Sequence, residues 1–359
     1  MKMRTDIFYW KCDCPISLKE KKEQFSAAEF TESAHDQVDA VVRKFLGHSP
    51  EKLNILPSDG NHHIAIITDK NQQFFFRADE GPLTEDIYLL AESTVMNLLH
   101  KNGFPVPEVH LTDISMKDVP FRFQIMDFST FPCLNKFAKA GTLDEKKIAV
   151  QSGNFLGKLH SLHFPGFGFF NTDKLLAGDS LQGLDNSAAA YFRKCLDKHL
   201  NYLTSNQLLE EDKENRIRTA FERAMPLLDG IQGTLLHRDY AYWNILGTET
   251  EIKQVIDWDD SISGDPADDF GIIGCFLSEE LIGIILEEYK KYHPVDDSFI
   301  TRIHLHTLRN MLWKAVIRSS MGYFDRGKDF FLTGPGGMPL KEYTFLKIDN
   351  ELKQLEILL

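Results

Sequence analysis

The sequence predicts an α+β fold of two lobes, a small antiparallel sheet followed by a mainly helical part. Strand-like apolar runs are concentrated before about residue 127, whereas helical spacing of apolar residues dominates after it. A chain of 359 residues is long enough to bury a core in each lobe. We therefore divide the chain into an N-terminal extension (1–35), a sheet-containing lobe (36–127) and a helical lobe (128–359).

The first lobe is predicted from the order of its apolar patterns. Two β-rich runs flank the turn residues Asp69-Lys70-Asn71, which favours a hairpin. A periodic helical segment follows, and Asn102-Gly103 is a typical helix end. The elements expected in chain order are a helix over 35–46, strands over 64–68 and 73–78, a helix over 84–100, and strands over 108–111 and 121–126.

The second lobe shows helical periodicity in most of its length, interrupted by one strand-rich stretch over 234–258. The expected helices cover 145–162, 187–203, 208–224, 281–292 and 298–321. A sheet-rich first part followed by helices with a single hairpin is an α+β arrangement.

Charge and composition exclude several classes of protein. The formal net charge of −13 disfavours binding to nucleic acid or to acidic membranes. No run approaches the roughly 20 apolar residues of a membrane span. The five cysteines are scattered and odd in number, as expected for free thiols in a reducing compartment. We expect a cytoplasmic protein; the sequence does not specify its oligomeric state.

The clearest chemical pattern is the segment from His237 to Asn244. Its residues His237-Arg238-Asp239, followed five positions later by Asn244, fit the kinase catalytic-loop pattern H-R-D-x-x-x-x-N. An apolar strand then ends in Asp257. Phosphoryl transfer needs a base at the acceptor hydroxyl and oxygen ligands for magnesium. Asp239 suits the base, whereas Asn244 and Asp257 suit the metal.

Nucleotide-binding residues are expected in the first lobe. Gly60 lies in a turn that would cover phosphates, and Arg77 stands where a kinase has a phosphate-contacting lysine. Glu92, midway along the helix expected over 84–100, is placed to pair with Arg77. The backbone of the hinge residues Met126, Asp127 and Phe128 would bond adenine.

Other residues near the catalytic loop are expected to support it or to bind the acceptor. Asp265 before Pro266 is typical of a helix N-terminus, and Asp269 is placed to reach the catalytic-loop backbone. With His237 these residues are expected to support the site. Asp259 and Asp260 are candidates for recognising an acceptor amine. Tyr242 and Trp243 either shape the acceptor pocket or pack against the helical lobe.

Taken in order, several motifs resemble the aminoglycoside phosphotransferase family, which has a protein-kinase-like fold. They are Gly103-Phe104-Pro105-Val106-Pro107, residues 156–163 (LGKLHSLH), residues 237–246, Ile256-Asp257-Trp258 and Gly264-Asp265-Pro266. Short pieces such as Phe74-Phe75-Phe76-Arg77 are similar to hygromycin-type members. The resemblance implies ATP or GTP between the lobes, Asp239 as base, and Mg²⁺ on Asn244 and Asp257. Arg77 departs from the usual lysine, and it is not a geometric equivalent of it.

The resemblance implies a kinase for a hydroxyl group of a small molecule, with a cationic compound or an aminoglycoside-type antibiotic among the candidates. No A-P-E motif follows Asp257, and Gly264-Asp265-Pro266 arrives too soon to leave a peptide-docking segment. The alternatives are a metabolic kinase for choline, homoserine or methylthioribose, a non-catalytic nucleotide-binding protein, and an enzyme that transfers a nucleotidyl group.

Overall fold

A computed structural model describes residues 32–56, 63–79, 87–326, 332, 334 and 337–359 of the chain. Gly60, residues 1–31 of the expected extension and residues 84–86 of an expected helix lie outside the described residues. Among the described helices, none has both the length and the apolar character that crossing a membrane requires.

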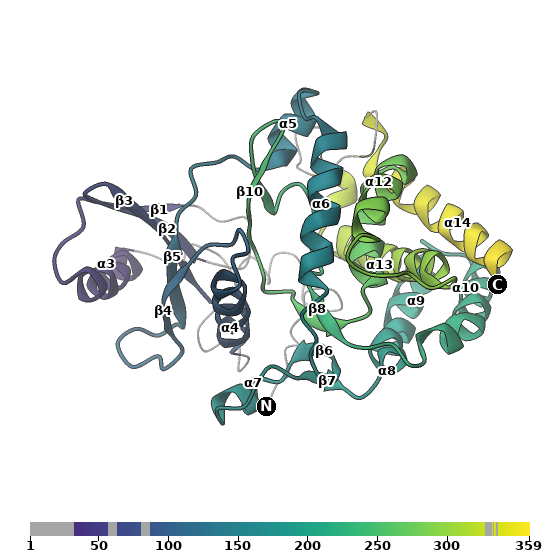
Figure 1. Cartoon of the computed structure of the whole chain (residues 1–359), viewed down its shortest axis with the longest axis horizontal. Coiled ribbons are helices and arrows are strands. Elements are labelled where there is room, and N and C mark those ends of the chain that lie inside the picture. Colours follow the sequence, from purple (N-terminus) through teal and green to yellow (C-terminus); the bar gives the residue numbers. More distant parts are fainter. Residues whose placement is uncertain (1–31, 57–62, 80–86, 327–331, 333, 335–336) are drawn as a thin grey trace.

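The N-terminal lobe is an antiparallel sheet with the strand order β1-β2-β3-β5-β4 and one helix on each face (Figure 1). Its elements are α3 (Glu32–Leu46), β1 (Lys52–Leu56), β2 (His63–Asp69), β3 (Gln72–Ala78), α4 (Tyr88–Lys101), β4 (Val109–Asp113) and β5 (Phe123–Asp127). Strand β1 was not expected, because its half-exposed residues have no continuous apolar face.

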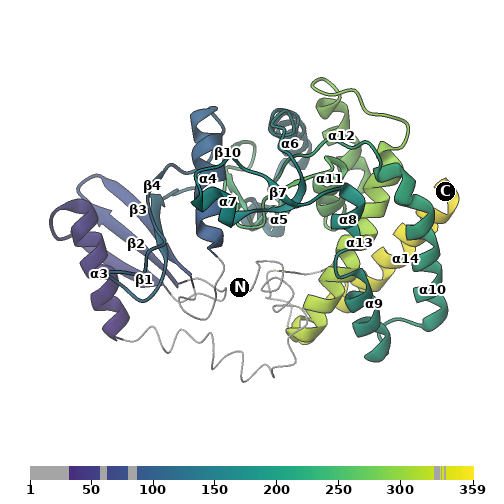
Figure 2. The same ribbon diagram turned by 90° about the horizontal axis from the view of Figure 1, so that it is seen from below.

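The alternation of side chains on β3 decides which residues face the rest of the molecule. Phe74 and Phe76 are buried in one cluster with Val38 and Val42 of α3. Successive residues of a strand point to opposite faces, so Phe75 and Arg77 face the other way. That face carries α4, which stands between the sheet and the helical lobe (Figure 2).

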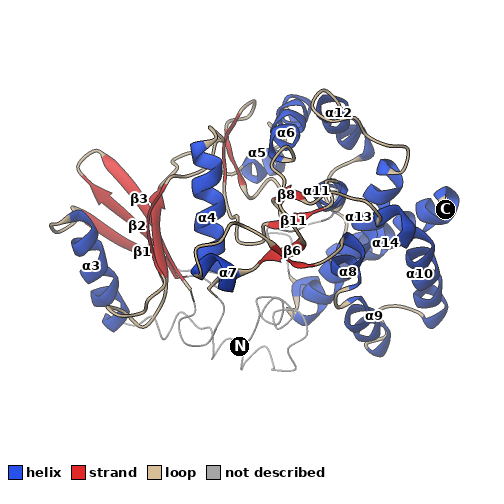
Figure 3. Ribbon diagram, turned by 60° about the horizontal axis from the view of Figure 1, so that its bottom comes forward, coloured by secondary structure: helices blue, strands red, loops and turns tan. Residues whose placement is uncertain are grey.

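The helical lobe contains a two-stranded ribbon and a four-stranded sheet among its helices (Figure 3). In chain order its elements are α5 (Leu134–Ala140), α6 (Glu145–Leu159), β6 (Phe167–Phe170), α7 (Thr172–Leu176), β7 (Gly183–Asp185), α8 (Ala188–Arg193), α9 (Leu196–Ser205), α10 (Glu211–Ala224), η2 (Met225–Leu228), β8 (Thr234–Leu236), β9 (Ile245–Gly247), β10 (Ile252–Val255), β11 (Ile262–Gly264), α11 (Ala267–Gly274), α12 (Glu279–Tyr289), α13 (Phe299–Ser320), η3 (Tyr323–Asp325) and α14 (Leu340–Leu358).

The predicted two-lobed α+β architecture is confirmed, but several local elements besides β1 differ from the expectation. The helix expected over 187–203 is two helices, because Cys195 takes a left-handed backbone conformation with φ of 58° and breaks the hydrogen-bond ladder. The four-stranded sheet β7-β6-β11-β8 was not expected. Its strands are three or four residues long, too short to show a period of two.

Close packing of α11 against α13 brings the long helix α13 beside the catalytic segment. A Cβ at Gly271 would lie 2.6 Å from Cβ of His306, so this approach requires a glycine. Helix α13 contacts the catalytic segment directly, because Asn310 Oδ1 accepts a hydrogen bond from Arg238 Nη1 over 3.0 Å.

Candidate active site

The segment 237–244 joins β8 to β9, and Asp269 of α11 anchors its backbone. Asp269 accepts hydrogen bonds from the backbone N–H of His237 (3.0 Å) and of Arg238 (2.8 Å). His160 Nε2 lies 3.2 Å from the same carboxylate. His237 in turn places its Nε2 3.0 Å from the carbonyl oxygen of Ile256, which ties the loop to the segment after β10. The loop is therefore fixed at its N-terminal end, at residues 237 and 238.

Arg238 occupies a left-handed backbone conformation with φ of 69°, which is uncommon outside glycine. Its buried guanidinium compensates by contacting Asp268 Oδ1 at 2.7 Å. Burial acts to lower the pKa of Arg238, but the Asp268 carboxylate together with Tyr191, Asp260 and Asp269 outweighs it and raises that pKa above its ordinary value. Such strain persists only where the surroundings determine the conformation, and it concentrates at functional sites.

The Asp239 carboxylate is oriented by its own loop. Trp243 Nε1 and Asn244 Nδ2 both donate to Oδ2 of Asp239, over 3.0 and 2.8 Å. The other oxygen, Oδ1, lies 4.0 Å from Nζ of Lys314 on α13. Within the described ranges, Lys314 is the only basic side chain that close to Asp239. One carboxylate oxygen is thus locked while the other faces a cation.

A cavity of about 260 Å³ lies between the lobes and gathers most of the residues predicted to bind nucleotide and metal. From the first lobe it is lined by Arg77, Glu92, Met126, Asp127 and Phe128, and from the second by Asn244 and Asp257. The remaining walls are Ile64, Phe75, Met96, Pro107, Ser129, Leu246, Gln254 and Ile256.

Arg77 is the centre of an ionic network at the back of this cavity. Its Nη1 lies 2.6 Å from Glu92 Oε1, and its Nη2 lies 2.9 Å from Asp259 Oδ2. Asp257 Oδ1 is 3.3 Å from Nη1. Burial acts to lower the pKa of Arg77, but these carboxylates, Glu92 first, raise it well above its ordinary value. The arginine is therefore held in its charged form.

Asp257 is accessible from the cleft, as a metal ligand must be. Its side chain is 42% exposed and lines the cavity, and its backbone has a φ of 65°. Partial loss of hydration in the cleft and then the Asp259 charge raise the pKa of Asp257 above its ordinary value, and Arg77 only partly offsets them. A divalent cation would relieve this crowding of carboxylates. Carboxylate and amide oxygens are the ligands Mg²⁺ takes, so Asp257 and Asn244 fit that ion.

Three other predicted residues are engaged by neighbouring basic groups. Asp259 pairs with Arg77, and the Asp260 charge acts on Arg238. Asp265 Oδ1 accepts from the backbone N–H of Ala267 at the start of α11. Its Oδ2 accepts from Arg302 Nε over 3.0 Å and lies 3.0 Å from His306 Nε2. Burial acts to raise the pKa of Asp265, but these groups lower it.

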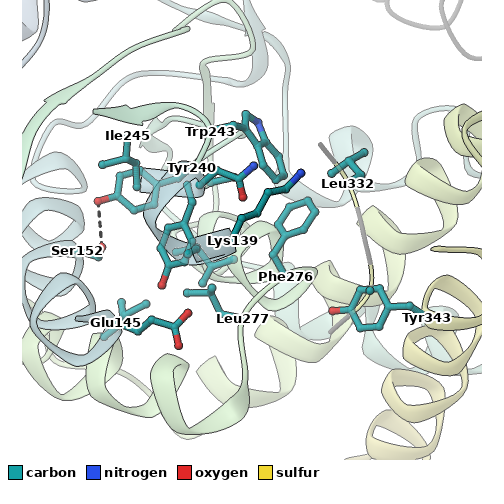
Figure 4. A pocket seen from close by; sticks show the side chains of 17 residues that line it. Lys139, Glu145, Ser152, Tyr240, Trp243, Ile245, Phe276, Leu277, Leu332 and Tyr343 are labelled. Carbon is teal, nitrogen blue, oxygen red and sulfur yellow. Dashed lines mark hydrogen bonds between the residues drawn. The ribbon is translucent and has the colours of Figure 1, made fainter. Parts of the chain in front are cut away.

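A second cavity, of about 420 Å³, is lined in part by residues 240–243 of the catalytic loop (Figure 4). Tyr242 and Trp243 both line it, so the structure places these aromatic residues at a cavity wall. Asp259 and Asp260 do not line it. Its lining residues are Asn135, Ala138, Lys139, Glu145, Ser152, Tyr240, Ala241, Tyr242, Trp243, Ile245, Ile273, Phe276, Leu277, Ile285, Leu332, Gly334 and Tyr343.

Sequence reasoning missed two polar residues of the site. Gln124 of β5 donates from Nε2 to Glu92 Oε2 over 2.7 Å and fixes the partner of Arg77. Lys314 faces Asp239 from α13. Both share one signal, a polar residue inside an otherwise apolar run: Phe-Gln-Ile-Met at 123–126 and Leu-Trp-Lys-Ala-Val at 312–316.

With fold and site in place, comparison with known proteins defines the class. Residues 56–296, more than half of the chain, match the family model described as the phosphotransferase enzyme family. The chain belongs to that family. It is accordingly a phosphotransferase with a kinase-like fold, a small-molecule kinase whose acceptor is an alcohol group.

Solved structures with the same fold include aminoglycoside phosphotransferases and putative fructosamine-3-kinases. A thermostable mutant of aminoglycoside phosphotransferase APH(4)-Ia, in complex with AMP-PNP and hygromycin B, is 14% identical with a TM-score of 0.62, covering 88% of this chain and 98% of its own. A putative fructosamine-3-kinase from Haemophilus somnus 129PT is 16% identical with a TM-score of 0.58, covering 89% and 96%. ADP-bound APH(2'')-Ib is 16% identical with a TM-score of 0.54, covering 90% and 97%. No curated protein matches the chain.

Proposed function

We propose that this chain transfers the γ-phosphoryl group of ATP to a hydroxyl group of a small molecule in a magnesium-dependent reaction. The observation that carries the proposal is the convergence of Arg77, Glu92, Asn244 and Asp257 on one cavity, directly beside the oriented carboxylate of Asp239. Those residue types in that arrangement are the ones phosphoryl transfer uses.

The 260 Å³ cavity suits a nucleotide. Its walls include Phe75, Met96, Met126, Leu246 and Ile256, an apolar slot for a flat base, and the hinge residues 126–128 border it. Rings of Phe75 and Phe128 stack with centroids 6.5 Å apart. Related structures support this use, since one APH(4)-Ia complex contains AMP-PNP and another contains ADP.

Asn244 and Asp257 are the residues that would hold Mg²⁺. Asn244 uses its Nδ2 to hold Asp239, so its amide oxygen is the atom it offers to a cation. A bound Mg²⁺ supplies neutralisation of the charge on the phosphate oxygens. Because the Asn244 amide contacts Asp239 through Nδ2 and offers its oxygen to the metal, the base and the metal ligands are positioned together.

The reaction has a simple balance. The acceptor oxygen forms a bond to the γ-phosphorus while the bond from that phosphorus to the bridging oxygen of ADP breaks. The proton of the acceptor hydroxyl passes to the Asp239 carboxylate, and ADP leaves. Trp243 and Asn244 hold the carboxylate in place during the step. Only seven residues separate Asp257 from Asp265, which leaves no long segment for docking a peptide and favours a small acceptor.

The test is ADP release with ATP and Mg²⁺ against a panel of hygromycin B, other aminoglycosides, macrolides, choline, homoserine, methylthioribose and fructosamines. Acceptor-dependent ADP release that is lost in Asp239→Asn supports the proposal. Failure of the folded protein to bind ATP with Mg²⁺ would contradict it and favour a non-catalytic protein.

A further inference from the structure

Two histidines and two acidic residues gather around the hinge residue Asp127. Asp127 ends β5, and His110 lies on the neighbouring edge strand β4, which Glu108 precedes (Figure 1). One ligand atom from the side chain of each of these three residues lies within 4.8 Å of the other two. His100, in the last turn of α4, stands beside them, with its Nε2 3.7 Å from Glu108 Oε2. We call these four residues the hinge cluster.

An irregularity in β4 and a packed aromatic ring orient His110. The pairing of β4 with β5 shifts register between Val109 and Leu111, so that His110 is an extra residue between them. Such a β-bulge re-aims a side chain and is common beside functional sites. The His110 ring stands edge-on to the ring of Phe74, with centroids 5.4 Å apart, and its Nε2 lies 2.8 Å from Asp127 Oδ1. The imidazole is therefore held facing the carboxylate.

The two carboxylates of the hinge cluster lie close together and have imidazoles as their ion-pair partners. Glu108 pairs with His100 and Asp127 with His110; within the described ranges, no lysine or arginine nitrogen lies within 4.0 Å of either carboxylate. Two carboxylates this close repel each other, and a simple surface ion pair needs only one of them. Both acidic side chains are about half exposed, so an ion can reach them from solvent. A cation placed among these donors would relieve the repulsion.

The donor atoms of the hinge cluster select the kind of ion. Imidazole nitrogen together with carboxylate oxygen suits Zn²⁺ and similar transition-metal ions, whereas Mg²⁺ takes oxygen ligands. Ligand atoms on a tetrahedral Zn²⁺, each about 2.0–2.2 Å from the ion, lie about 3.4 Å from one another. The two distances between imidazole and carboxylate, 2.8 and 3.7 Å, fall on either side of that spacing. Small movements of these surface side chains would therefore accommodate the ion.

We infer that the hinge cluster binds a divalent transition-metal ion of the Zn²⁺ type, with Glu108, His110 and Asp127 as ligands and His100 completing the set. This site is separate from the proposed Mg²⁺ position, because Asp127 is the one member of the hinge cluster among the described residues that line the 260 Å³ cavity. The bound ion would join β4 and α4 to the hinge. It needs no phosphoryl transfer, so its binding can be measured independently of the proposed kinase function.

Binding is tested with Zn²⁺ alone as the probe. The full-length protein is titrated with Zn²⁺ in the presence of excess Mg²⁺, in competition with a chromophoric chelator whose colour change reports the affinity. Excess Mg²⁺ occupies sites made of oxygen ligands, so the Zn²⁺ that still binds reports sites with nitrogen or sulfur donors. We expect a Zn²⁺ site that Mg²⁺ does not displace.

Variants assign the Zn²⁺ to the hinge cluster. Glu108→Gln and His110→Phe each remove one ligand, and the phenylalanine keeps a ring at this position. The affinity for Zn²⁺ should fall roughly a hundredfold or more in each, because the loss of even an outer partner of a metal ligand costs roughly tenfold to a hundredfold. His100→Gln should lower it roughly tenfold. His48→Phe is the matched control; it removes an exposed imidazole of the same lobe that pairs with Asp69 over 3.4 Å, and the affinity should not change.

The position of the ion is measured directly in crystals of the unaltered protein soaked in Zn²⁺, from anomalous scattering at the zinc absorption edge. The expected result is an anomalous peak within bonding distance of Glu108, His110 and Asp127. A peak found only at other residues, displacement of the Zn²⁺ by Mg²⁺, or unchanged affinity in folded Glu108→Gln and His110→Phe would each overturn the inference. Unchanged affinity in His100→Gln would overturn the place of His100 in the ligand set.

Discussion

Arg77 Nη2 lies 2.9 Å from Asp259 Oδ2, a contact between residues 182 positions apart. The arginine belongs to β3 of the N-terminal lobe, whereas the aspartate follows β10 in the helical lobe. Through Nη1 the same side chain also binds Glu92 of α4. One guanidinium therefore joins the sheet, the helix α4 and the acidic segment at the cleft. The planar fork of arginine suits this bridging, and the compact ammonium of lysine would not reach both carboxylates in the same way.

Removing Arg77 should destabilise the fold strongly. Arg77→Met leaves Glu92 and Asp259 with uncompensated charges, and Glu92 is buried. We expect the free energy of unfolding to fall by about 3 kcal/mol or more, measured by urea denaturation. The control Arg193→Met breaks the exposed pair with Glu222 and should cost less than about 1 kcal/mol. Equal losses in the two variants would show that the network contributes no more than a surface pair.

Replacing Asp239 should remove turnover and leave nucleotide binding. Asp239→Asn keeps the size of the side chain that Trp243 and Asn244 contact but removes the base. We expect kcat to fall by roughly a hundredfold to ten-thousandfold, with the affinity for ATP nearly unchanged. Steady-state kinetics and calorimetry measure the two quantities. A folded Asp239→Asn protein that no longer bound ATP would argue against Asp239 as the base.

The metal role of Asp257 predicts an effect that depends on magnesium. Asparagine tolerates the left-handed backbone of Asp257 better than alanine does, so Asp257→Asn isolates the loss of charge. We expect affinity for AMP-PNP with Mg²⁺ to fall roughly tenfold or more, with little change in metal-free affinity. Asp260→Asn is the control, because the charge of Asp260 acts on Arg238. A loss that is equal with and without Mg²⁺ would remove Asp257 from the metal site.

His199 on α9 should make the fold sensitive to acid. Burial, followed by the charges of Arg309 and Lys198, lowers the pKa of His199 to about 3. A depressed histidine pKa means that the unfolded chain binds the proton first. Stability is therefore complete above the unfolded pKa of about 6.5 and falls as the pH decreases toward 3. The contribution lost between about pH 7 and about pH 5 is about 2 kcal/mol.

The matched variant for this effect is His199→Gln, which does not titrate. Between neutral and acidic pH, the urea midpoint should fall less in His199→Gln than in the unaltered protein. An identical acid dependence in the two proteins would show that other groups cause the loss.

Local features of the site were predictable because the residues that form them are close together in the sequence. Asp239 and Asn244 belong to the same short loop. The antiparallel ribbon β9-β10 then brings Asp257 back toward Asn244. The pairing of Arg77 with Glu92 was also predictable, from their order and spacing relative to the catalytic-loop motif and from the ion pair that kinase sites require. The two-lobed architecture followed from the change in periodicity near residue 127.

Features that depend on tertiary packing were not predictable. Lys314 meets Asp239 only because α11 and α13 pack closely at Gly271, and no local pattern encodes that approach. The strands β6, β7, β8 and β11 are too short for a periodic signal, and the left-handed Cys195 splits a pattern that looks like one helix. Asp259 was expected at the acceptor, whereas its partner is Arg77, which is distant in sequence.

The most direct test of the central claim is the fate of label from ATP. With ATP labelled at the γ-phosphate and Mg²⁺, an accepted alcohol should acquire the label, and the transfer should disappear in Asp239→Asn. Transfer of label from the α-phosphate instead would contradict the account and indicate a nucleotidyl transferase.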